Sequence, residues 1–289
     1  MGVETPTATR TALLTAVVLI AFAGNSVLAR AALFDGSIGA LEFTAVRFAG
    51  GALALAPFLG GALGHWRAKL PGALALTIYG VAFSLAYLDL PAGTGALLLF
   101  GFVQVTMIGV GLRSGERPSP RRMLGFTIAV AGLIWLVAPG VGAPDPTAAA
   151  SMAIAGVAWG AYTLAGRGVA DPTRSTATNF LIATPLVVLA TAIAGEGPWS
   201  ARGVALAAAS GVLTSGLGYV LWYAALRGHS AISAAIVQLL VPAIAALGGV
   251  IFLAEELTAR LVGSGLVTLA GVALAILAAS RPAASELDA

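Results

Sequence analysis

The chain of 289 residues has no cysteine, only two histidines and few charged side chains. Without cysteine there can be no disulfide framework, thiolate metal site or cysteine nucleophile. Only 9% of the residues are charged, against about 25% in soluble domains, whereas 59% are hydrophobic. Water does not solvate so apolar a surface but lipid does, so the composition predicts an integral membrane protein whose main partner is the lipid bilayer.

Motifs for several other functions are missing as well. There is no Gly-x-x-x-x-Gly-Lys-Ser/Thr loop and no nucleotide domain, so we expect neither direct ATP drive nor a cofactor. No metal-ligand set, Ser/His/Asp constellation or carboxylate pair falls at membrane depth, so we expect neither an enzyme nor a metal site. The net charge of +3 does not gather in a stripe, so we expect no nucleic acid partner.

Ten apolar segments are present instead. A helix that crosses about 30 Å of hydrocarbon needs about 20 mostly apolar residues. We expect transmembrane helices at Ala12–Leu33, Ile38–Leu59, Gly72–Leu88, Ala92–Leu112, Met123–Val137, Thr147–Ala165, Thr176–Ala194, Val204–Leu226, Ala231–Ala254 and Arg260–Ala279. No gap between them is long enough for a soluble domain, so the function must reside within the membrane.

The basic residues predict the orientation. Eleven of the 15 Lys and Arg fall in one set of alternate gaps and three in the other. The first set is Arg10, Arg67, Lys69, Arg113, Arg117, Arg121, Arg122, Arg167, Arg174, Arg227 and Arg281, and the second is Arg30, Arg202 and Arg260. Cytoplasmic loops carry the excess of Lys and Arg, so we expect a multi-pass inner-membrane protein with both termini in the cytoplasm.

The chain also repeats itself weakly. Residues 116–119 (Glu-Arg-Pro-Ser) precede the fifth segment, and residues 255–258 (Glu-Glu-Leu-Thr) precede the tenth, 139 positions later. At the same offset Gly132 matches Gly271, Ala92 matches Ala231 and Ala96 matches Ala235, and near an offset of 136 residues 24–29 match residues 160–165 at three positions. We therefore predict two five-helix repeats, residues 1–143 and 144–289. Because five is odd, the repeats are inverted, which places a binding site near the membrane midplane.

With these features the sequence resembles the drug/metabolite transporter superfamily, in its EamA-type branch. The resemblance covers the whole chain. It rests on the ten helices, on the Glu-x-x-Ser/Thr entries at residues 116–119 and 255–258, on Arg47-Phe48, and on Tyr223-Ala224-Ala225-Leu226 followed by Ser230-Ala231. Overall the chain is most similar to the aromatic amino acid exporters of YddG type. The resemblance implies an all-α fold of ten transmembrane helices, as two inverted repeats around a central cavity.

Candidate substrate-binding residues are the polar and aromatic side chains at membrane depth. By the resemblance, helices one, three, four, six, eight and nine line the cavity. The candidates on them are Asn25, Tyr79, Phe83, Gln104, Trp159, Tyr162, Tyr219 and Gln238. An amide can hold a carboxylate or an ammonium, and aromatic faces suit an apolar side chain. Interhelical hydrogen bonds, core packing and, for Tyr219, an interfacial belt are the alternatives.

Three further residues are predicted to have gating or structural roles. Arg47 lies inside the second segment, as a strut or as an anchor for a substrate carboxylate, and Glu42 is its nearest acidic residue in that helix. Pro185 and Pro242 fall in mid-helix, where each removes a backbone hydrogen bond and provides a hinge or a fixed kink.

Together these features predict a transporter that exports small organic solutes, most simply aromatic or apolar amino acids, by alternating access. Export of other metabolites or drugs is the alternative, followed by a channel or sensor. No Asp or Glu falls clearly in a helix core, and both histidines lie in predicted loops. Proton antiport and facilitated diffusion or exchange therefore both stay open. Gly248, Gly249, Gly263 and Gly265 suit internal packing and a dimer face equally, so the sequence predicts no particular oligomeric state.

Overall fold

A computed structural model describes residues 8–60, 62–115, 118–166, 169–194, 197–229 and 237–279. Within these ranges the chain is almost entirely helical, and β-structure is limited to an isolated bridge between Ile38 and Trp199. The helices are α1 (Ala8–Leu33), α2 (Ala40–Leu55), η1 (Ala56–Phe58), η2 (Ala62–Lys69), α3 (Leu70–Ala86), α4 (Ala92–Arg113), α5 (Pro120–Val137), α6 (Pro146–Ala165), α7 (Pro172–Ala194), α8 (Ala201–Ala209), η3 (Ser210–Leu217), α9 (Gly218–Leu226), α11 (Val241–Leu253) and α12 (Ala259–Ala279).

Nine spans in the described part of the chain are long and apolar enough to cross a membrane. One of them, Ala201–Leu226, is a continuous rod made of α8, the π-helical segment η3 and α9. The ninth predicted helix corresponds to the shorter α11, because residues 230–236 lie outside the described ranges. The sequence positions Glu116, Arg117, Arg167, Ser230, Ala231, Ala235 and Arg281 also lie outside them. The prediction of an all-α membrane protein is confirmed.

Side-chain caps begin several of these helices. The hydroxyl of Ser119 accepts a hydrogen bond from the backbone N–H of Arg122 at 3.3 Å, and that of Thr258 accepts one from Leu261 at 3.1 Å. The carboxylate of Asp145 accepts one from Ala148 at 2.8 Å. In each case an oxygen at the helix start satisfies a backbone donor that has no partner within the helix. The two Glu-x-x-Ser/Thr entries thus end in true caps.

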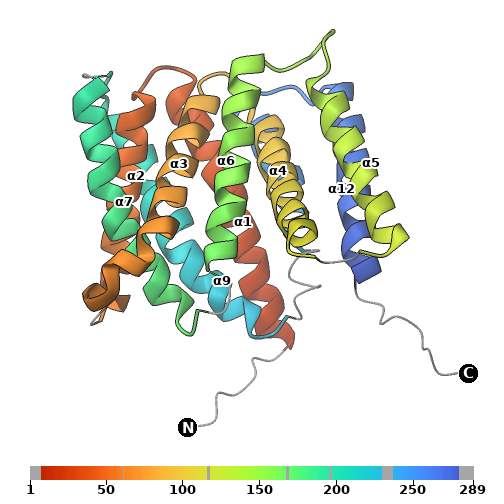
Figure 1. Cartoon of the computed structure of the whole chain (residues 1–289). Helices are drawn as coiled ribbons and strands as arrows, with labels where there is room; N and C mark the ends of the chain where they lie inside the picture. The colour runs from red at the N-terminus through yellow and green to blue at the C-terminus, as the bar shows by residue number, and fades with distance from the viewer. Residues whose placement is uncertain are drawn as a thin grey trace, which may run out of the picture.

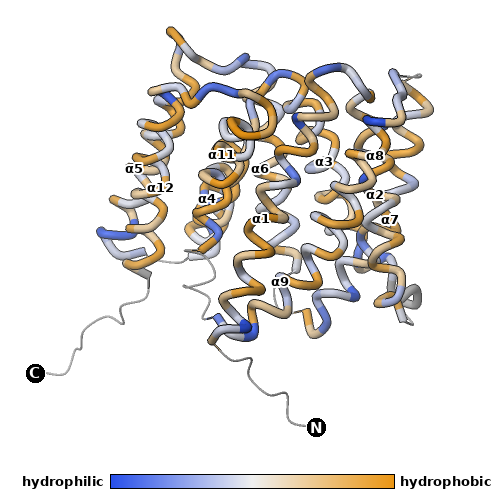
Figure 2. The backbone as a smooth tube through the Cα atoms, turned by 180° about the vertical axis from the view of Figure 1, so that it is seen from behind, coloured by the Kyte–Doolittle hydropathy of each residue, from blue (hydrophilic) through white to orange (hydrophobic). Residues whose placement is uncertain are grey.

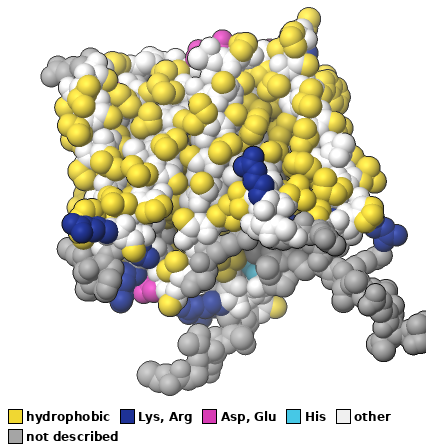
Figure 3. Space-filling model, in the orientation of Figure 1, with side chains coloured by type: hydrophobic (Ala, Val, Ile, Leu, Met, Phe, Trp, Pro, Cys, Tyr) yellow, Lys and Arg dark blue, Asp and Glu magenta, His cyan; other side chains and the backbone are white. Residues whose placement is uncertain are grey.

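The helices stand side by side, and α1 begins on the same face of the bundle where α12 ends (Figure 1). We call this the termini face and the other end the opposite face. Hydrophobic residues run along the helices, whereas hydrophilic ones gather near their ends (Figure 2). Figure 3 shows a broad apolar band around the flank, with most of the visible Lys and Arg side chains in its lower part, toward the termini face.

Helices α5 and α12 form a tight pair at one side of the bundle (Figure 1). Glycines on both helices bring their backbones close, because a Cβ on Gly132 would lie 2.7 Å from the backbone nitrogen of Thr268. In the rest of the bundle α2 packs on α7, α3 on α6, α4 on α6 and α11, and α1 on the α8–η3–α9 rod and on α11. This larger group encloses the site described next.

Candidate functional site

A cavity of about 790 Å³ lies inside the bundle. Its wall is formed by α1, α2, η2, α3, α4, α6, α7, η3 and α9, together with Gln238. Lining residues reach the helix ends at the termini face, such as Lys69, Gly166 and Leu226. Toward the opposite face the lining stops in mid-helix, near Ser26 and Leu99. The cavity therefore opens at the termini face and ends inside the bundle.

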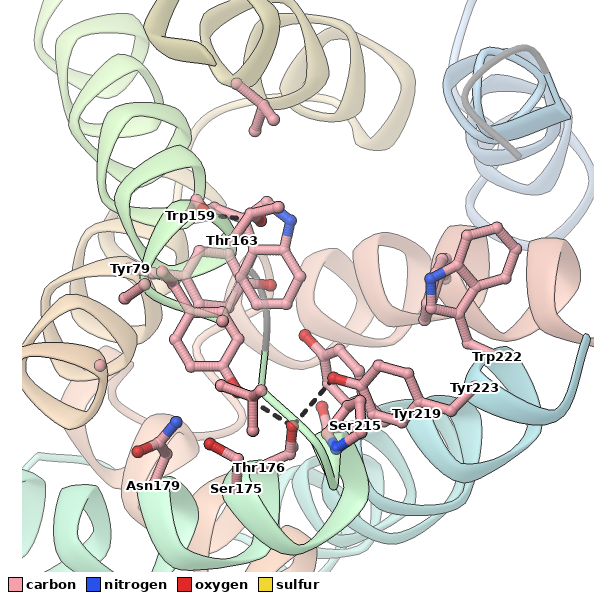
Figure 4. A pocket seen from close by; sticks show the side chains of 18 of the residues that line it. Tyr79, Trp159, Thr163, Ser175, Thr176, Asn179, Ser215, Tyr219, Trp222 and Tyr223 are labelled. Carbon is pink, nitrogen blue, oxygen red and sulfur yellow. Dashed lines mark hydrogen bonds between the residues drawn. The ribbon is translucent and has the colours of Figure 1, made fainter. Parts of the chain in front are cut away.

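Aromatic side chains form the middle of the wall. The ring of Trp159 lies 4.8 Å from that of Tyr79, 5.1 Å from that of Tyr162 and 5.6 Å from that of Tyr219. Figure 4 shows Tyr79 and Trp159 on one side of the cavity, and Tyr219, Tyr223 and Trp222 from α9 on the other. Such faces offer a large apolar contact area with a few polar atoms at the ring edges.

Close packing of α6 against α4 fixes the position of Trp159. This residue stands between Gly156 and Gly160, and a Cβ on either glycine would lie 2.6 to 2.8 Å from a side chain of α4, Phe102 or Thr106. Small residues four apart let two helix backbones approach closely. The Gly-x-x-Trp-Gly sequence thus joins the two helices and leaves the indole as part of the cavity wall.

A cluster of hydroxyl and amide groups lies near the mouth of the cavity. Tyr162 donates a hydrogen bond to Thr176 at 3.1 Å, and the hydroxyl of Tyr223 lies 3.0 Å from the same oxygen (Figure 4). Lys69 donates to Ser175 at 3.1 Å, which joins η2 to the first turn of α7. These bonds link α6, α7 and α9 on the side where the cavity opens.

A second polar network surrounds Arg47 of α2, which is 2% exposed and lines the cavity. Its Nε donates to the hydroxyl of Ser215 at 3.1 Å, and its Nη2 donates to the hydroxyl of Tyr79 at 2.9 Å. Asn25 donates to the same tyrosine oxygen at 3.4 Å and accepts hydrogen bonds from Ser210 at 2.7 Å and Thr214 at 3.3 Å. The network joins α1, α2, α3 and η3 at the inner end of the cavity.

The π-helical turn places these hydroxyls. Gly211 in η3 touches the backbone carbonyl of Arg47, so a larger residue there would push the two segments apart. π-Helical turns are rare and often occur at functional sites, because the extra residue per turn re-aims the side chains. Here Thr214 and Ser215 both reach the cavity.

The structure places seven of the eight predicted substrate-binding residues in the cavity wall: Asn25, Tyr79, Gln104, Trp159, Tyr162, Tyr219 and Gln238. Phe83 is the exception: it does not line the cavity, so the prediction that it belongs to the wall is wrong. It is fully buried one turn beyond Tyr79, with its ring 5.4 Å from that of Tyr79 and 4.7 Å from that of Tyr87. Tyr79 covers it because residues four apart share a helix face.

The predictions for the other three residues fare differently. Arg47 forms no ion pair with Glu42 among the described contacts, since Glu42 accepts a hydrogen bond from the backbone of Gly197 at 2.6 Å. Pro185 lies inside α7, as expected, and is exposed on the outside of the bundle. Pro242 is not in mid-helix but in the first turn of α11, where the missing N–H would have no helical partner in any case.

Sequence reasoning missed several lining residues. The main omission is the start of α7, where Ser175, Thr176 and Asn179 reach the cavity. The run Ser-Thr-Ala-Thr-Asn at residues 175–179 is unusually polar for the end of an apolar helix and could have indicated this face. Trp222 and Tyr223 of α9 also line the cavity.

The opposite face is closed by buried polar contacts. Arg30, in the last turn of α1, forms an ion pair with Glu255 at 3.2 Å, and its Nη1 donates to the backbone oxygen of Leu88 at 2.8 Å. Glu255 also accepts a hydrogen bond from the N–H of Ala92 at 2.9 Å, at the start of α4. One charge pair therefore joins α1, the α3–α4 connection and the segment between α11 and α12.

These features define a class of protein. The bundle of apolar helices encloses a cavity of the size that binds small organic molecules, open at one face and closed at the other. Among the described lining residues no nucleophile–base pair or metal-ligand set occurs that would indicate an enzyme. A solute-binding cavity within membrane-spanning helices is the arrangement of a membrane transport protein.

Comparison with known proteins identifies the family. Residues 147–277 match the EamA-like transporter family. The chain is 49% identical to an uncharacterized protein of Pseudomonas aeruginosa over 92% of this chain and 94% of that one. It is 30% identical to the threonine/homoserine exporter RhtA of Escherichia coli K12 over 87% of each chain, and 31% identical to that of Salmonella typhimurium over 76% of each. The chain belongs to the EamA-like transporter family.

The fold itself also has a solved relative. A crystal structure without a functional description covers 93% of this chain and 99% of its own, with a TM-score of 0.62 and 22% sequence identity. At that identity the likeness concerns the fold alone. The expected membership of the EamA branch of the drug/metabolite transporters is confirmed, and at this level the protein is a transporter of small solutes rather than an enzyme.

Proposed function

We propose that this transporter exports amino acids with aromatic or apolar side chains, by alternating access. The observation that carries the proposal is the cavity wall, in which Tyr79, Trp159 and Tyr219 face a shared space beside the amide of Asn25 and the guanidinium of Arg47. Aromatic faces suit a bulky apolar side chain, and the polar network suits a carboxylate.

The relatives support the amino acid class. Two of them are described as threonine/homoserine exporters, which handle small polar amino acids. In this chain the cluster around Trp159 favours larger apolar side chains, as in the exporters of YddG type. Threonine and homoserine are therefore the second candidate substrates, and the experiment below includes them.

The helix pairing supports two inverted repeats at residues 1–143 and 144–289. In such an arrangement each helix of the first repeat is equivalent to the helix five spans later. Three of these equivalent pairs pack against each other: α5 with α12, α2 with α7, and α4 with α11. The packing of α3 on α6 likewise corresponds to that of the α8–η3–α9 rod on α1. Rocking of one repeat against the other would open the cavity at either face in turn.

The distribution of cations supports cytoplasmic termini in an inner membrane. Arg113, Arg121 and Arg174 lie at helix ends on the termini face, with Arg67 and Lys69 in η2. By the positive-inside rule this face is cytoplasmic, and the cavity then opens to the cytoplasm, the state in which an exporter takes up its substrate.

Facilitated diffusion or exchange is the mode of coupling that we propose. Proton-coupled carriers commonly use Asp, Glu or His within the membrane. The described residues that line the cavity include none of these three types. A pH gradient is therefore expected to leave the rate of transport unchanged.

Uptake of labelled amino acids into proteoliposomes tests the proposal. We expect saturable uptake of phenylalanine and tryptophan, insensitive to a pH gradient and inhibited poorly by threonine and homoserine. Trp159→Ala removes the central ring of the cluster and is expected to lower uptake about tenfold or more. Trp66→Ala, which changes an exposed residue of η2 outside the cavity, is the matched control.

The alternatives give different results in the same assay. Uptake of threonine and homoserine in preference to phenylalanine would replace the proposed substrates with the second candidates. Absence of uptake of all four, with inserted and folded protein, would contradict the amino acid class. Flux that does not saturate would indicate a channel.

A further inference from the structure

We propose that the cavity recognises its ligand through the carboxylate, held by Arg47, and that the amino group is dispensable. Aromatic monocarboxylates without an amino group are then ligands as well. The inference deepens the proposed function, because it concerns the same cavity and narrows the substrate class.

The charges of the cavity wall are all of one sign. Arg47 and Lys69 are the charged side chains among its described lining residues, and no Asp or Glu joins them. Lys69 lies at the mouth, beside the first turn of α7, and Arg47 lies at mid-helix depth. Such a cavity attracts an anionic group along its whole length and offers no carboxylate to an ammonium group.

Arg47 has no counterion among the described residues. Its guanidinium takes part in none of the ion pairs present there, and its Nη1 has no hydrogen-bond partner. A buried charge without a partner costs several kcal/mol, so buried cations are normally paired. The wall therefore carries an incomplete site that a carboxylate would complete.

The neighbours of Arg47 hold its guanidinium in place. Ser215 and Tyr79 each accept one hydrogen bond from it, and its central carbon lies 4.8 Å from the centre of the Phe83 ring. A planar guanidinium held in this way is suited to a carboxylate, which can accept two parallel hydrogen bonds from its N–H groups. Phe83 thus acts from behind the wall, by supporting the arginine, rather than as a wall residue.

The amino group of an amino acid finds a weaker site. The side-chain oxygen of Asn25 already accepts hydrogen bonds from Ser210 and Thr214. The rings of Trp159 and Tyr219 remain as π faces for an ammonium, and a cation over a ring gains less than a buried ion pair. The carboxylate therefore dominates recognition, and the aromatic ring of the ligand adds apolar contact.

Two analogues of phenylalanine test the inference on the wild-type protein. 3-Phenylpropanoate keeps the carboxylate and lacks the amino group, and 2-phenylethylamine has the reverse. The readout is the thermal unfolding midpoint of the purified full-length protein in detergent, which rises with a bound ligand and does not require transport. We expect 3-phenylpropanoate to bind roughly 30-fold or more tightly than 2-phenylethylamine, the loss that follows removal of one partner of a buried charge pair.

Variants of Arg47 sharpen the result. Arg47→Gln is expected to abolish the preference for 3-phenylpropanoate. Arg47→Lys is expected to retain part of it, because lysine keeps the positive charge but lacks the paired N–H donors of a guanidinium. Arg202→Gln removes an exposed arginine outside this cavity and is the matched control, with unchanged binding. If Arg47→Gln does not fold, the wild-type comparison still decides.

The outcomes separate this inference from the proposed function. Equal binding of the two analogues, preference for the amine, or binding of neither overturns the inference, even where phenylalanine uptake shows that the transporter handles amino acids. Preferential binding of 3-phenylpropanoate without amino acid uptake supports the inference and contradicts the proposed function.

Discussion

The two ends of the cavity are built differently. At the opposite face, buried polar groups join distant parts of the chain: Arg30 with Glu255, and Glu42 with the backbone of Gly197. At the termini face, the described contacts around the mouth are hydrogen bonds without an ion pair, such as Lys69 with Ser175 and Tyr162 with Thr176. One end is thus closed by buried charges and the other is left open.

The difference matters for the proposed transport cycle, in which the closed end has to open. A hydrogen-bonded charge pair can exchange its partners for water when the helices that carry it separate. Of the three arginines described at the opposite face, Arg30 is the one that forms a mostly buried ion pair. Arg30 binds Glu255, Arg202 pairs with Asp35, and Arg260 donates to backbone oxygens beyond the end of α5, at 2.6 Å for Ala138. Because the Arg202–Asp35 pair is exposed and Arg260 joins α12 to the end of α5, Arg30 is the cation that joins helices around the cavity at this face.

The largest effect is expected from the buried pair. Glu255→Gln removes the charge that compensates Arg30. Because the pair is only partly buried, with side chains 8% and 14% exposed, we expect a cost below that of fully buried pairs, which is about 3–5 kcal/mol. We expect the opposite face to open and the rate of export to fall about tenfold or more. Because the chain has no cysteine, Ser26→Cys in the inner wall can report this opening through labelling by a membrane-impermeant maleimide added to intact cells.

The labelling experiment has its own control. Val141→Cys, in the exposed α5–α6 connection on the opposite face, should be labelled with and without the Glu255 change. Labelling of Ser26→Cys at the same rate in both backgrounds would show that this ion pair does not close the cavity.

A smaller effect is expected from the second buried carboxylate. Glu42→Ala leaves the N–H of Gly197 without its partner, which costs about 1–3 kcal/mol for a buried donor. We expect a lower thermal unfolding midpoint, and a several-fold slower uptake of phenylalanine. An unchanged midpoint would mean that water replaces the carboxylate at no cost.

At the open end the expected effect is smaller and depends on salt. Lys69→Gln removes a cation at the mouth that would steer a carboxylate inward. We expect the apparent affinity for phenylalanine to weaken about two- to fivefold at low ionic strength and the difference to vanish in high salt, where such fields are screened. A loss that persists at high salt would instead assign Lys69 a direct contact with the bound substrate.

The smallest effect is expected from the exposed pair of the closed face. Asp35→Asn breaks the contact with Arg202, but both side chains are about half exposed, at 41% and 58%. Exposed pairs contribute about 0–1 kcal/mol, so uptake and the unfolding midpoint should match the wild type. A strong defect would show that exposed as well as buried contacts hold this face closed.

Much of the fold follows from local pattern. Nine of the ten predicted apolar segments coincide with the nine spans found in the described part of the chain, and Ser119 and Thr258 cap the helices that follow the two Glu-x-x-Ser/Thr entries. The ninth segment was predicted least accurately. A proline in an apolar run does not reveal whether the helix kinks or begins there, and in this chain Pro242 lies in the first turn of α11. A proline is compatible with a kink inside a helix and with the start of a helix, and the packing of the neighbouring helices decides between the two.

The cavity was predicted less completely. Seven of the eight predicted substrate-binding residues lie in the wall, because polar and aromatic side chains in apolar helices are costly to bury in lipid and so indicate a cavity. The error at Phe83 arose because residue type does not reveal depth, and Tyr79 covers it. The polar start of α7 was missed because a short hydrophilic run at a helix end is equally typical of a membrane boundary.

The sequence by itself determined that this chain is an all-α membrane protein and in which family it belongs, because hydropathy and motif order are properties of the chain alone. The tertiary structure decided which end of the cavity is closed and that Arg47 has Ser215 and Tyr79 as partners instead of Glu42. Ser215 lies 168 positions and Tyr79 lies 32 positions from Arg47 along the chain. The physical reason is that partners so distant meet only through helix packing, which no local periodicity encodes.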